Sequence, residues 1–364
     1  ITIERDIKDR FERQRIWSAV LGGETDTGDF FARYSASYSK ASERENGSLD
    51  PVQFEREFEG EGFAVDVDYS DTRRPSFAFG NLASVALDPT EYELNDVEYT
   101  ALSDAQDEEY ALQLDLGREF AMGSGVFTVQ GGAKARWRDK SYNFEVEFYE
   151  LDDFYLSDVL GTQTYRLFDI SPVADKTAPR DFFEANFSQF ELQEIDSAFD
   201  SAVEDFSVTE DIYAGYLLGR FDSDLLTVIG GVRYERTENV LNGNDTLLVE
   251  EDGTLPGGGI ATDDTVIVTP VTFERSYDHW LPSLNIKVTP GDDLVMRLAG
   301  YRSIVRPKLS ALAPRFIVEE ADDGEREGEF GNPDLVPYEA WNLDATIEYY
   351  MSSNGALTAG VFYK

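Results

Sequence analysis

Carboxylates are the commonest chemically active side chains of this sequence, which carries 72 acidic and 31 basic residues. One acidic run is dense enough to suggest a metal site, and it consists of Glu145, Glu147, Glu150, Asp152 and Asp153. Because Ca²⁺ prefers oxygen ligands, such a run could hold this ion in a loop. EF-hand spacing is absent, however, and a solvated acidic surface explains the run more simply. We therefore predict no cofactor, with Ca²⁺ at these five acids as the alternative.

The residue types on which most enzymes depend are scarce. The chain has no Cys, and its one His, His279, stands beside Trp280, where we expect an interfacial position rather than a ligand. We find no GxSxG, P-loop or HExxH arrangement. With 72 carboxylates in the sequence, a pair of acids at a glycosidase-like separation would not by itself indicate an active site. A net charge of -41 would also repel phosphates. The sequence therefore predicts neither an enzyme nor a protein that binds nucleic acid.

A group of aromatic residues overlaps the acidic run and could contact a ligand. Its members are Tyr149, Phe154, Tyr155, Tyr165, Phe168, Phe182 and Phe183. Exposed rings stack on sugar rings, whereas buried rings pack a loop against itself. The first five residues are our candidates for ligand contact, and loop packing is the alternative for all of them.

The elements that position these side chains are predicted to be β-strands, because apolar and polar residues alternate along the sequence. From Phe127 to Trp137, apolar or small residues alternate with Thr128, Gln130, Gly132, Lys134 and Arg136. The same alternation occurs at Phe30–Tyr38, Tyr110–Leu116, Leu226–Tyr234, Trp280–Val288, Leu294–Gly300, Leu343–Tyr349 and Leu357–Tyr363. Because successive side chains of a strand point to opposite faces, each segment has one apolar and one polar face. We expect five basic residues on the polar faces to line a wet lumen, where they contact an anionic ligand or balance neighbouring acids: Arg33, Lys134, Arg136, Arg233 and Arg297.

The connections between these segments alternate in length. Short ones are predicted near Gly22–Asp29, Gly117–Gly125, Asp222–Asp224, Pro290–Asp293 and Ser352–Gly355. Long ones are predicted near Ala41–Gly62, Glu150–Asp205, Leu241–Thr265 and Ser303–Pro337, with one or two short amphipathic helices within Ala178–Phe206. An antiparallel meander with short periplasmic turns and long extracellular loops is typical of an outer-membrane β-barrel. A soluble two-layer β protein that buries its apolar faces is the alternative.

Three stretches resemble a known family. "GNPDLVPYEAWNLDATIEYY" (Gly331–Tyr350) resembles the barrel signature of TonB-dependent outer-membrane receptors. "WLPSLNIKVTPGDDLVMRLAGYRSIVRPKLSAL" (Trp280–Leu312) and "EDIYAGYLLGRFDSDLLTVIGGVRYERTENVLNG" (Glu210–Gly243) are similar to hairpins of the same family, closest to its Caulobacter-like branch. Proline fixes its own φ and restricts the residue before it, so the motif sets the angle at which a loop re-enters a strand. The matching positions, for which the resemblance implies structural roles, are Arg306, Pro307, Gly331, Asn332, Pro333, Leu335, Pro337, Asn342 and Asp344.

The resemblance implies an all-β fold in which residues 1–364 form part of a transmembrane barrel that has 22 strands in the family. The family's plug domain, the segment that pairs with TonB and the last strands are not recognisable, so we expect a fragment of a longer receptor. The implied function is active uptake of a scarce nutrient across the outer membrane of a Gram-negative bacterium. Its implied partners are TonB, outer-membrane lipid and a small-molecule ligand. The ligand could be an oligosaccharide, which a negative field favours, or a ferric siderophore. A passive porin and a soluble secreted binding protein are the alternatives.

Overall fold

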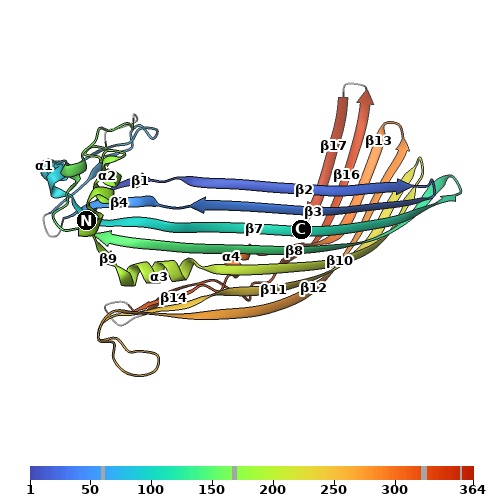
Figure 1. Ribbon diagram of the computed structural model, residues 1–364. Coiled ribbons are helices and arrows are strands. Elements are labelled where there is room, and N and C mark those ends of the chain that lie inside the picture. Colours follow the sequence, from blue (N-terminus) through green and yellow to red (C-terminus); the bar gives the residue numbers. More distant parts are fainter. Residues whose placement is uncertain (59–61, 166–169, 321–325, 353–354) are drawn as a thin grey trace.

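The computed structural model is dominated by one large sheet that bends along its width, so that its last strands stand at an angle to the others (Figure 1). It describes residues 1–58, 62–165, 170–320, 326–352 and 355–364. The main path of antiparallel neighbours is β1 (Thr2–Asp9), β4 (Ser48–Glu57), β7 (Glu93–Met122), β8 (Gly125–Glu150), β10 (Phe206–Asp222), β11 (Leu226–Val249), β12 (Thr265–Gly291), β13 (Leu294–Val305), β16 (Tyr338–Ser352) and β17 (Gly355–Tyr363). Two further long strands are β2 (Glu12–Asp26) and β3 (Phe30–Glu45): β3 pairs with β7, and β2 pairs with β3. β3 continues the line of β4, and β2 continues the line of β1 (Figure 1). The predicted all-β antiparallel meander is confirmed.

Shorter elements occupy the connections. Their strands are β5 (Asp66–Asp68), β6 (Ser76–Ala78), β9 (Glu191–Gln193), β14 (Phe316–Glu320) and β15 (Arg326–Phe330). Their helices are α1 (Ala83–Ala86), α2 (Ala178–Asn186), α3 (Glu194–Glu204) and α4 (Leu309–Leu312), with short 3₁₀ turns at Gly80–Leu82, Pro89–Glu91, Leu156–Val159 and Phe187–Gln189. α2 and α3 confirm the helices predicted within Ala178–Phe206. Among the described residues, no helix has both the length and the apolar character needed to cross a membrane.

One predicted long connection is wrong, and a second begins later than predicted. In place of the connection Ala41–Gly62, β3 runs to Glu45 and β4 begins at Ser48, and the long connection instead joins β4 to β7. The connection expected to begin at Leu241 begins after Val249. Both errors have one cause, because these strand segments lack a continuous apolar face and so lose the alternation that identifies a strand.

The two faces of the sheet differ as predicted. We call the side that carries Leu112, Leu217, Leu298 and Leu343 the apolar face, and the opposite side the polar face. These four leucines are between 51% and 60% exposed. A soluble two-layer protein would bury such a face against a second layer. Because these side chains do not meet in a dry core, the soluble alternative is wrong, and the sheet fits the wall of a membrane barrel.

A belt of aromatic side chains crosses the apolar face. Its members are Tyr38, Tyr110, Trp137, Tyr213, Tyr234, Trp280 and Trp341. Neighbours along the belt touch: the ring centroids of Tyr38 and Tyr110 are 4.9 Å apart, and the Trp137 indole N–H donates to the Tyr213 hydroxyl at 3.1 Å. On one side of the belt the same strand faces carry Lys40, Glu108, Asp139, Asp211, Arg236 and Asp278. Such a change from apolar to charged residues across an aromatic girdle marks a membrane–water interface.

The distance from the belt to the short-turn end of the sheet matches a bilayer. From Phe127 to Trp137 the chain of β8 advances by ten residues. At about 3.4 Å per residue and a tilt of about 45°, ten residues rise about 24 Å, close to the apolar band of roughly 25 Å on known barrels. The strands also continue beyond the belt toward α1 and α2 (Figure 1). We call that part the extension; it exists because β7 and β12 have 30 and 27 residues, where about 9–11 suffice to span.

The extension has its own hydrophobic core. Leu49 and Phe54 of β4 are fully buried there with Tyr92 and Val97 of the β7 region. Burial of one such side chain stabilises the fold by about 1.5–3 kcal/mol. α2 and the turn at Leu156–Val159 close this core with Phe183, Leu156 and Val159. The extension is therefore a packed structure rather than a set of loose loops.

α3 replaces a strand beside β8. β10 begins only at Phe206, so the part of β8 beyond Tyr142 lacks that neighbour. The side chains of Ser197, Ser201 and Asp205 accept hydrogen bonds from the backbone N–H groups of Phe148, Val146 and Phe144, at 2.9, 3.0 and 2.7 Å. Serines four apart lie on one face of a helix and can reach alternate N–H groups of a strand. Between the end of the β10 pairing at Tyr142 and the short strand β9, which pairs with Phe148–Glu150, side chains thus satisfy the strand edge in place of another strand.

Candidate functional site

Buried charges concentrate on the polar face at the level of the belt. Glu210 of β10 is 2% exposed, and Glu235 of β11 is 9% exposed. Arg136 donates to Glu210 at 2.7 Å, and Arg233 and Arg306 both donate to Glu235 at 2.6 Å. A buried carboxylate requires such partners, because an uncompensated buried charge costs several kcal/mol. The polar face therefore holds a linked ion network that joins three strands to the segment after β13.

Arg306 is the residue through which that segment is attached. Its guanidinium also lies 3.3 Å from the Thr237 hydroxyl and 3.9 Å from Glu210. Immediately after it, Pro307 leads into α4, whose Leu309 and Leu312 pack on the polar side of the sheet. The residues that they cover are Phe206, Val208 and Leu241. Charge pairing and apolar packing together hold residues 306–313 against the wall.

Gly331 lies where two backbone segments nearly touch. Its N–H donates to the Arg315 carbonyl at 2.9 Å, and the Asn332 N–H donates to the Ala311 carbonyl at 3.1 Å. A Cβ atom at Gly331 would overlap the carbonyl oxygen of Ala313. The glycine of the motif is thus the residue that lets the end of this long connection dock on its beginning.

The other motif residues connect this docking point to β16. They are Pro333, Leu335, Pro337, Asn342 and Asp344. Both prolines are buried and Leu335 is 39% exposed. Asn342 is 3% exposed and donates to the Ser303 hydroxyl at 2.9 Å, while Asp344 lies on the same face. Leu343 between them is 57% exposed on the apolar face, as the alternation predicts.

The five basic residues expected in the lumen lie on the polar face. Four of them contact an acid: Arg33 contacts Glu24, Arg136 contacts Glu210, Arg233 contacts Glu235, and Arg297 contacts Glu348. Lys134 lies on β8 two residues before Arg136 and opposite Ala214. This arrangement fits charge balance among neighbouring acids better than five free cations. His279, expected at the interface, lies on β12 next to Trp280 of the belt, is 7% exposed and lies 2.8 Å from Glu339.

Two of the aromatic candidates belong to the core of the extension. Phe154 is 2% exposed, and its ring stacks on Phe182 with centroids 4.0 Å apart. Tyr149 is 7% exposed, and its hydroxyl donates to Glu147 at 2.7 Å. A ring whose face is covered cannot stack on a sugar, so ligand contact is wrong for Phe154, which packs the loop against the sheet.

The remaining aromatic candidates differ in position. Tyr155 is half-buried, Tyr165 is 44% exposed, and Phe168 lies outside the described residues. A hollow of about 720 Å³ opens beside Tyr149 in the extension. Its lining includes Tyr99, Glu147, Tyr149, Arg180, Phe183 and Phe187. Sequence reasoning missed this hollow because its walls come from β7, β8 and α2.

The five acids proposed for Ca²⁺ are not brought together. Glu145 and Glu147 lie on one face of β8 and Glu150 on the other, while Asp152 and Asp153 follow the end of the strand. Within the described part of the chain, no three His, Cys, Asp or Glu side chains come close enough to share a metal ion. The alternative of a Ca²⁺ site at this run is therefore not supported by the geometry.

Two half-buried acids of β7 make the stability of the extension depend on pH. Burial, followed by the charges of Asp50 and Asp96, raises the pKa of Glu98 to about 7, and burial raises that of Asp96 to about 6. An unfolded Glu titrates near 4.3, so the folded state binds more protons between about pH 4.3 and 7. Stability therefore falls as pH rises through this window.

We expect the extension to be less stable at pH 8 than at pH 5 by about 1–2 kcal/mol, after allowance for solvent screening of these half-buried groups. Glu98→Gln should remove most of the difference, whereas Glu184→Gln, at an exposed position, should keep it. Hydrogen exchange of β4 and β7 amides, corrected for intrinsic rates, measures the effect. An unchanged difference in Glu98→Gln would contradict the assignment.

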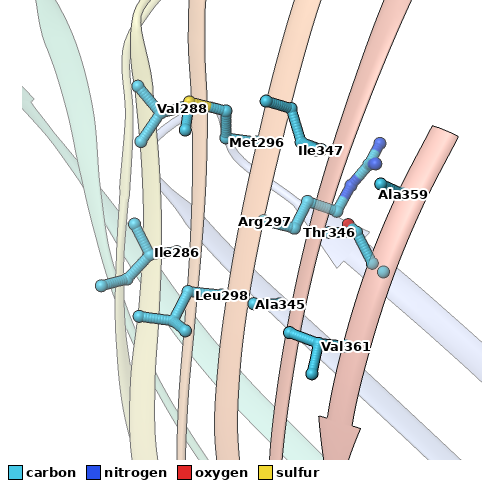
Figure 2. A pocket seen from close by; sticks show the side chains of 11 residues that line it. Ile286, Val288, Met296, Arg297, Leu298, Ala345, Thr346, Ile347, Ala359 and Val361 are labelled. Carbon is cyan, nitrogen blue, oxygen red and sulfur yellow. The ribbon is translucent and has the colours of Figure 1, made fainter. Parts of the chain in front are cut away.

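A groove of about 600 Å³ lies on the apolar face of the last hairpins. Figure 2 shows aliphatic side chains of neighbouring strands in it, among them Ile286, Met296, Leu298 and Ile347. Arg297 adjoins the groove, although its strand neighbours Met296 and Leu298 point to the apolar side. Because the groove lies between the belt and the short turns, it belongs to the hydrocarbon-facing surface and not to a site for a polar ligand.

A two-faced antiparallel sheet, bounded by an aromatic belt and charged on its inner side, defines the wall of a membrane β-barrel. Residues 12–364 match the family "TonB dependent receptor-like, beta-barrel", and the chain belongs to this family. No protein of curated function matches the sequence.

Two solved receptor structures are similar to this chain. The ferric-catecholate import receptor Fiu of E. coli K12, in its closed form, has 13% identity and a TM-score of 0.51, and the match covers 97% of this chain and 41% of that one. The siderophore receptor PiuA from Acinetobacter baumannii has 14% identity and a TM-score of 0.48, and the match covers 98% and 41%. The chain thus spans about 41% of the length of either receptor.

Proposed function

We propose that this chain forms part of the wall of an outer-membrane receptor that takes up a scarce nutrient into a Gram-negative cell with energy supplied through TonB. The observation that carries the proposal is the sheet with an exposed apolar face, an aromatic belt and a buried ion network on the other face. Such a wall separates lipid from a wet passage. Family membership supports uptake driven by TonB, which would act through a plug enclosed by the complete barrel.

The cargo that we favour is an anionic metal chelate of the ferric siderophore type. The net charge of -41 favours a neutral cargo when it is considered alone. The charge near the belt is different, because Arg136, Arg138, Lys140 and Arg306 gather there on the polar face. Local charge decides what the passage attracts at close range, since salt screens distant charges beyond about 8–10 Å.

An oligosaccharide is the second candidate, and the hollow in the extension favours it. Tyr99 and Phe187 supply aromatic surface there, and Glu147 and Arg180 supply hydrogen-bonding groups. Aromatic rings combined with a few polar groups are what sugar rings require. The two candidates therefore concern different parts of the wall and can be tested separately.

Uptake is tested with a deletion strain supplied with ferric siderophores as iron sources or oligosaccharides as carbon sources. We expect growth on at least one source to fall at least tenfold, and equally in a strain without TonB. Restoration of growth by the intact gene is the control. Growth that depends on this gene but not on TonB would identify a passive porin instead. Normal growth on every source would remove the uptake proposal.

A further inference from the structure

A pocket of about 490 Å³ on the polar face is lined mainly by cations. Arg136, Arg138 and Lys140 enter it from β8, and Arg306 and Lys308 enter it from the segment after β13. The three β8 residues alternate, so they project from one face at intervals of about 7 Å. In a chain with a net charge of -41, five basic side chains around one pocket are an exception that requires an explanation.

The neighbouring acids do not neutralise these cations completely. Arg138 pairs with Asp107 at 2.6 Å, and Lys140 lies 3.8 Å from the same carboxylate. The other acids close to the lining cations are Glu109, Glu210 and Glu235, and Glu235 is shared with Arg233. Six cations thus meet four carboxylates. Lys308 is exposed and forms no ion pair with any residue that the structure describes.

Two N–H donors beside the pocket lack acceptors. The Nε atoms of Arg136 and Arg306 are buried and have no hydrogen-bond partner among the described residues. The Nε atom of Arg136 lies 3.6 Å from Glu109 and that of Arg306 lies 3.9 Å from Glu210, both beyond hydrogen-bond distance. A buried donor without an acceptor is costly, and such donors are commonly satisfied by an anion or by water. Guanidinium groups are the side chains that best match carboxylate and phosphate oxygens.

We propose that this pocket binds a small oxyanion, the carboxylate or phosphate group of a solute, between β8 and the Arg306–Ser310 segment. The anion would accept hydrogen bonds from the guanidinium and ammonium groups that line the pocket and neutralise the excess charge. It would also hold the segment that begins at Arg306 against the wall. The proposal rests on the pocket alone and stands whether or not the cargo is a siderophore.

The test is isothermal titration of the membrane-purified protein in detergent, at fixed ionic strength, with citrate and with inorganic phosphate. We expect saturable binding of at least one of them, weakened at least tenfold by the double variant Lys140→Gln/Lys308→Gln. The matched control is Lys134→Gln/Lys287→Gln, which removes the same charge from the same face outside the pocket and should bind as the unmodified protein does.

Unchanged tryptophan emission and thermal unfolding in both variants exclude a folding defect. Binding of citrate alone assigns a polycarboxylate, and binding of phosphate assigns a site for any compact oxyanion; either supports the proposal. Absence of saturable binding of both anions would overturn it. Equal weakening in the control variant would overturn it as well, because it would show that only the overall charge of the face matters.

Discussion

Replacement of Gly331 by alanine is expected to separate the docked ends of the connection between β13 and β16, Leu309–Arg315 and Gly331–Asn332, and to destabilise the protein by about 3 kcal/mol or more. The added Cβ would overlap the carbonyl oxygen of Ala313, a backbone atom that cannot move aside as a side chain can. The hydrogen bonds from Gly331 to Arg315 and from Asn332 to Ala311 would be lost together. Chemical unfolding in detergent and hydrogen exchange of the Asn332 amide measure the change.

The matched control is Gly291→Ala. Gly291 ends β12, and a Cβ atom there would meet nothing within 4 Å. This variant should unfold within about 0.5 kcal/mol of the unmodified protein. If both glycine variants behaved alike, the close backbone approach at Gly331 would have no energetic importance.

Replacement of Arg306 by leucine is expected to cost about 3–5 kcal/mol, because it leaves Glu235 and Glu210 buried with fewer compensating charges. Arg306 donates to Glu235 at 2.6 Å and lies 3.9 Å from Glu210. The segment that it attaches to the wall should exchange its amides faster, beginning with the Ala311 amide, which donates to the Lys308 carbonyl.

The second substitution Glu235→Gln separates charge pairing from shape. Once that carboxylate is neutral, loss of Arg306 leaves less uncompensated charge. The double variant should therefore be more stable than the sum of the single changes predicts, by about 1–3 kcal/mol. Additive losses in a double-mutant cycle by chemical unfolding would mean that Arg306 acts through packing alone.

The part of the fold that contacts lipid is readable from the sequence. From Phe127 to Trp137 every second residue is apolar or small, because hydrocarbon accepts no charge on that face. Beyond Trp137 both faces of β8 meet water or loops, and Asp139 replaces the apolar residue. β4 was not identified as a strand for another reason: register shifts at Leu49/Val52 and Gln53/Phe54 interrupt the period of two among its buried residues. Apolar and polar residues alternate where one face of a strand meets lipid and the other meets water. The alternation is lost where both faces have similar surroundings, as in β8 beyond Trp137.

The ion network of the candidate site could not be predicted from local sequence patterns, because its residues are distant in the chain. Arg136 and Arg306 meet at Glu210, although Arg306 lies 96 residues after Glu210 in the chain. Likewise, Phe182 covers the ring of Phe154 only because α2 folds back on the extension. The resemblance identified Arg306 and Gly331 as important, but their partners depend on how the long connections fold back onto the wall. The structure supplied those partners.

In the receptor that we propose, the length of β7 and β12 determines where an incoming molecule first meets the protein. In the proposed orientation, the rim formed by these strands stands tens of ångströms above the lipid headgroups. Discrimination by size and charge can therefore take place at the rim, well away from the seal between protein and bilayer. Evolution can then alter what is admitted by changing the rim, while the lipid-contacting girdle stays as it is.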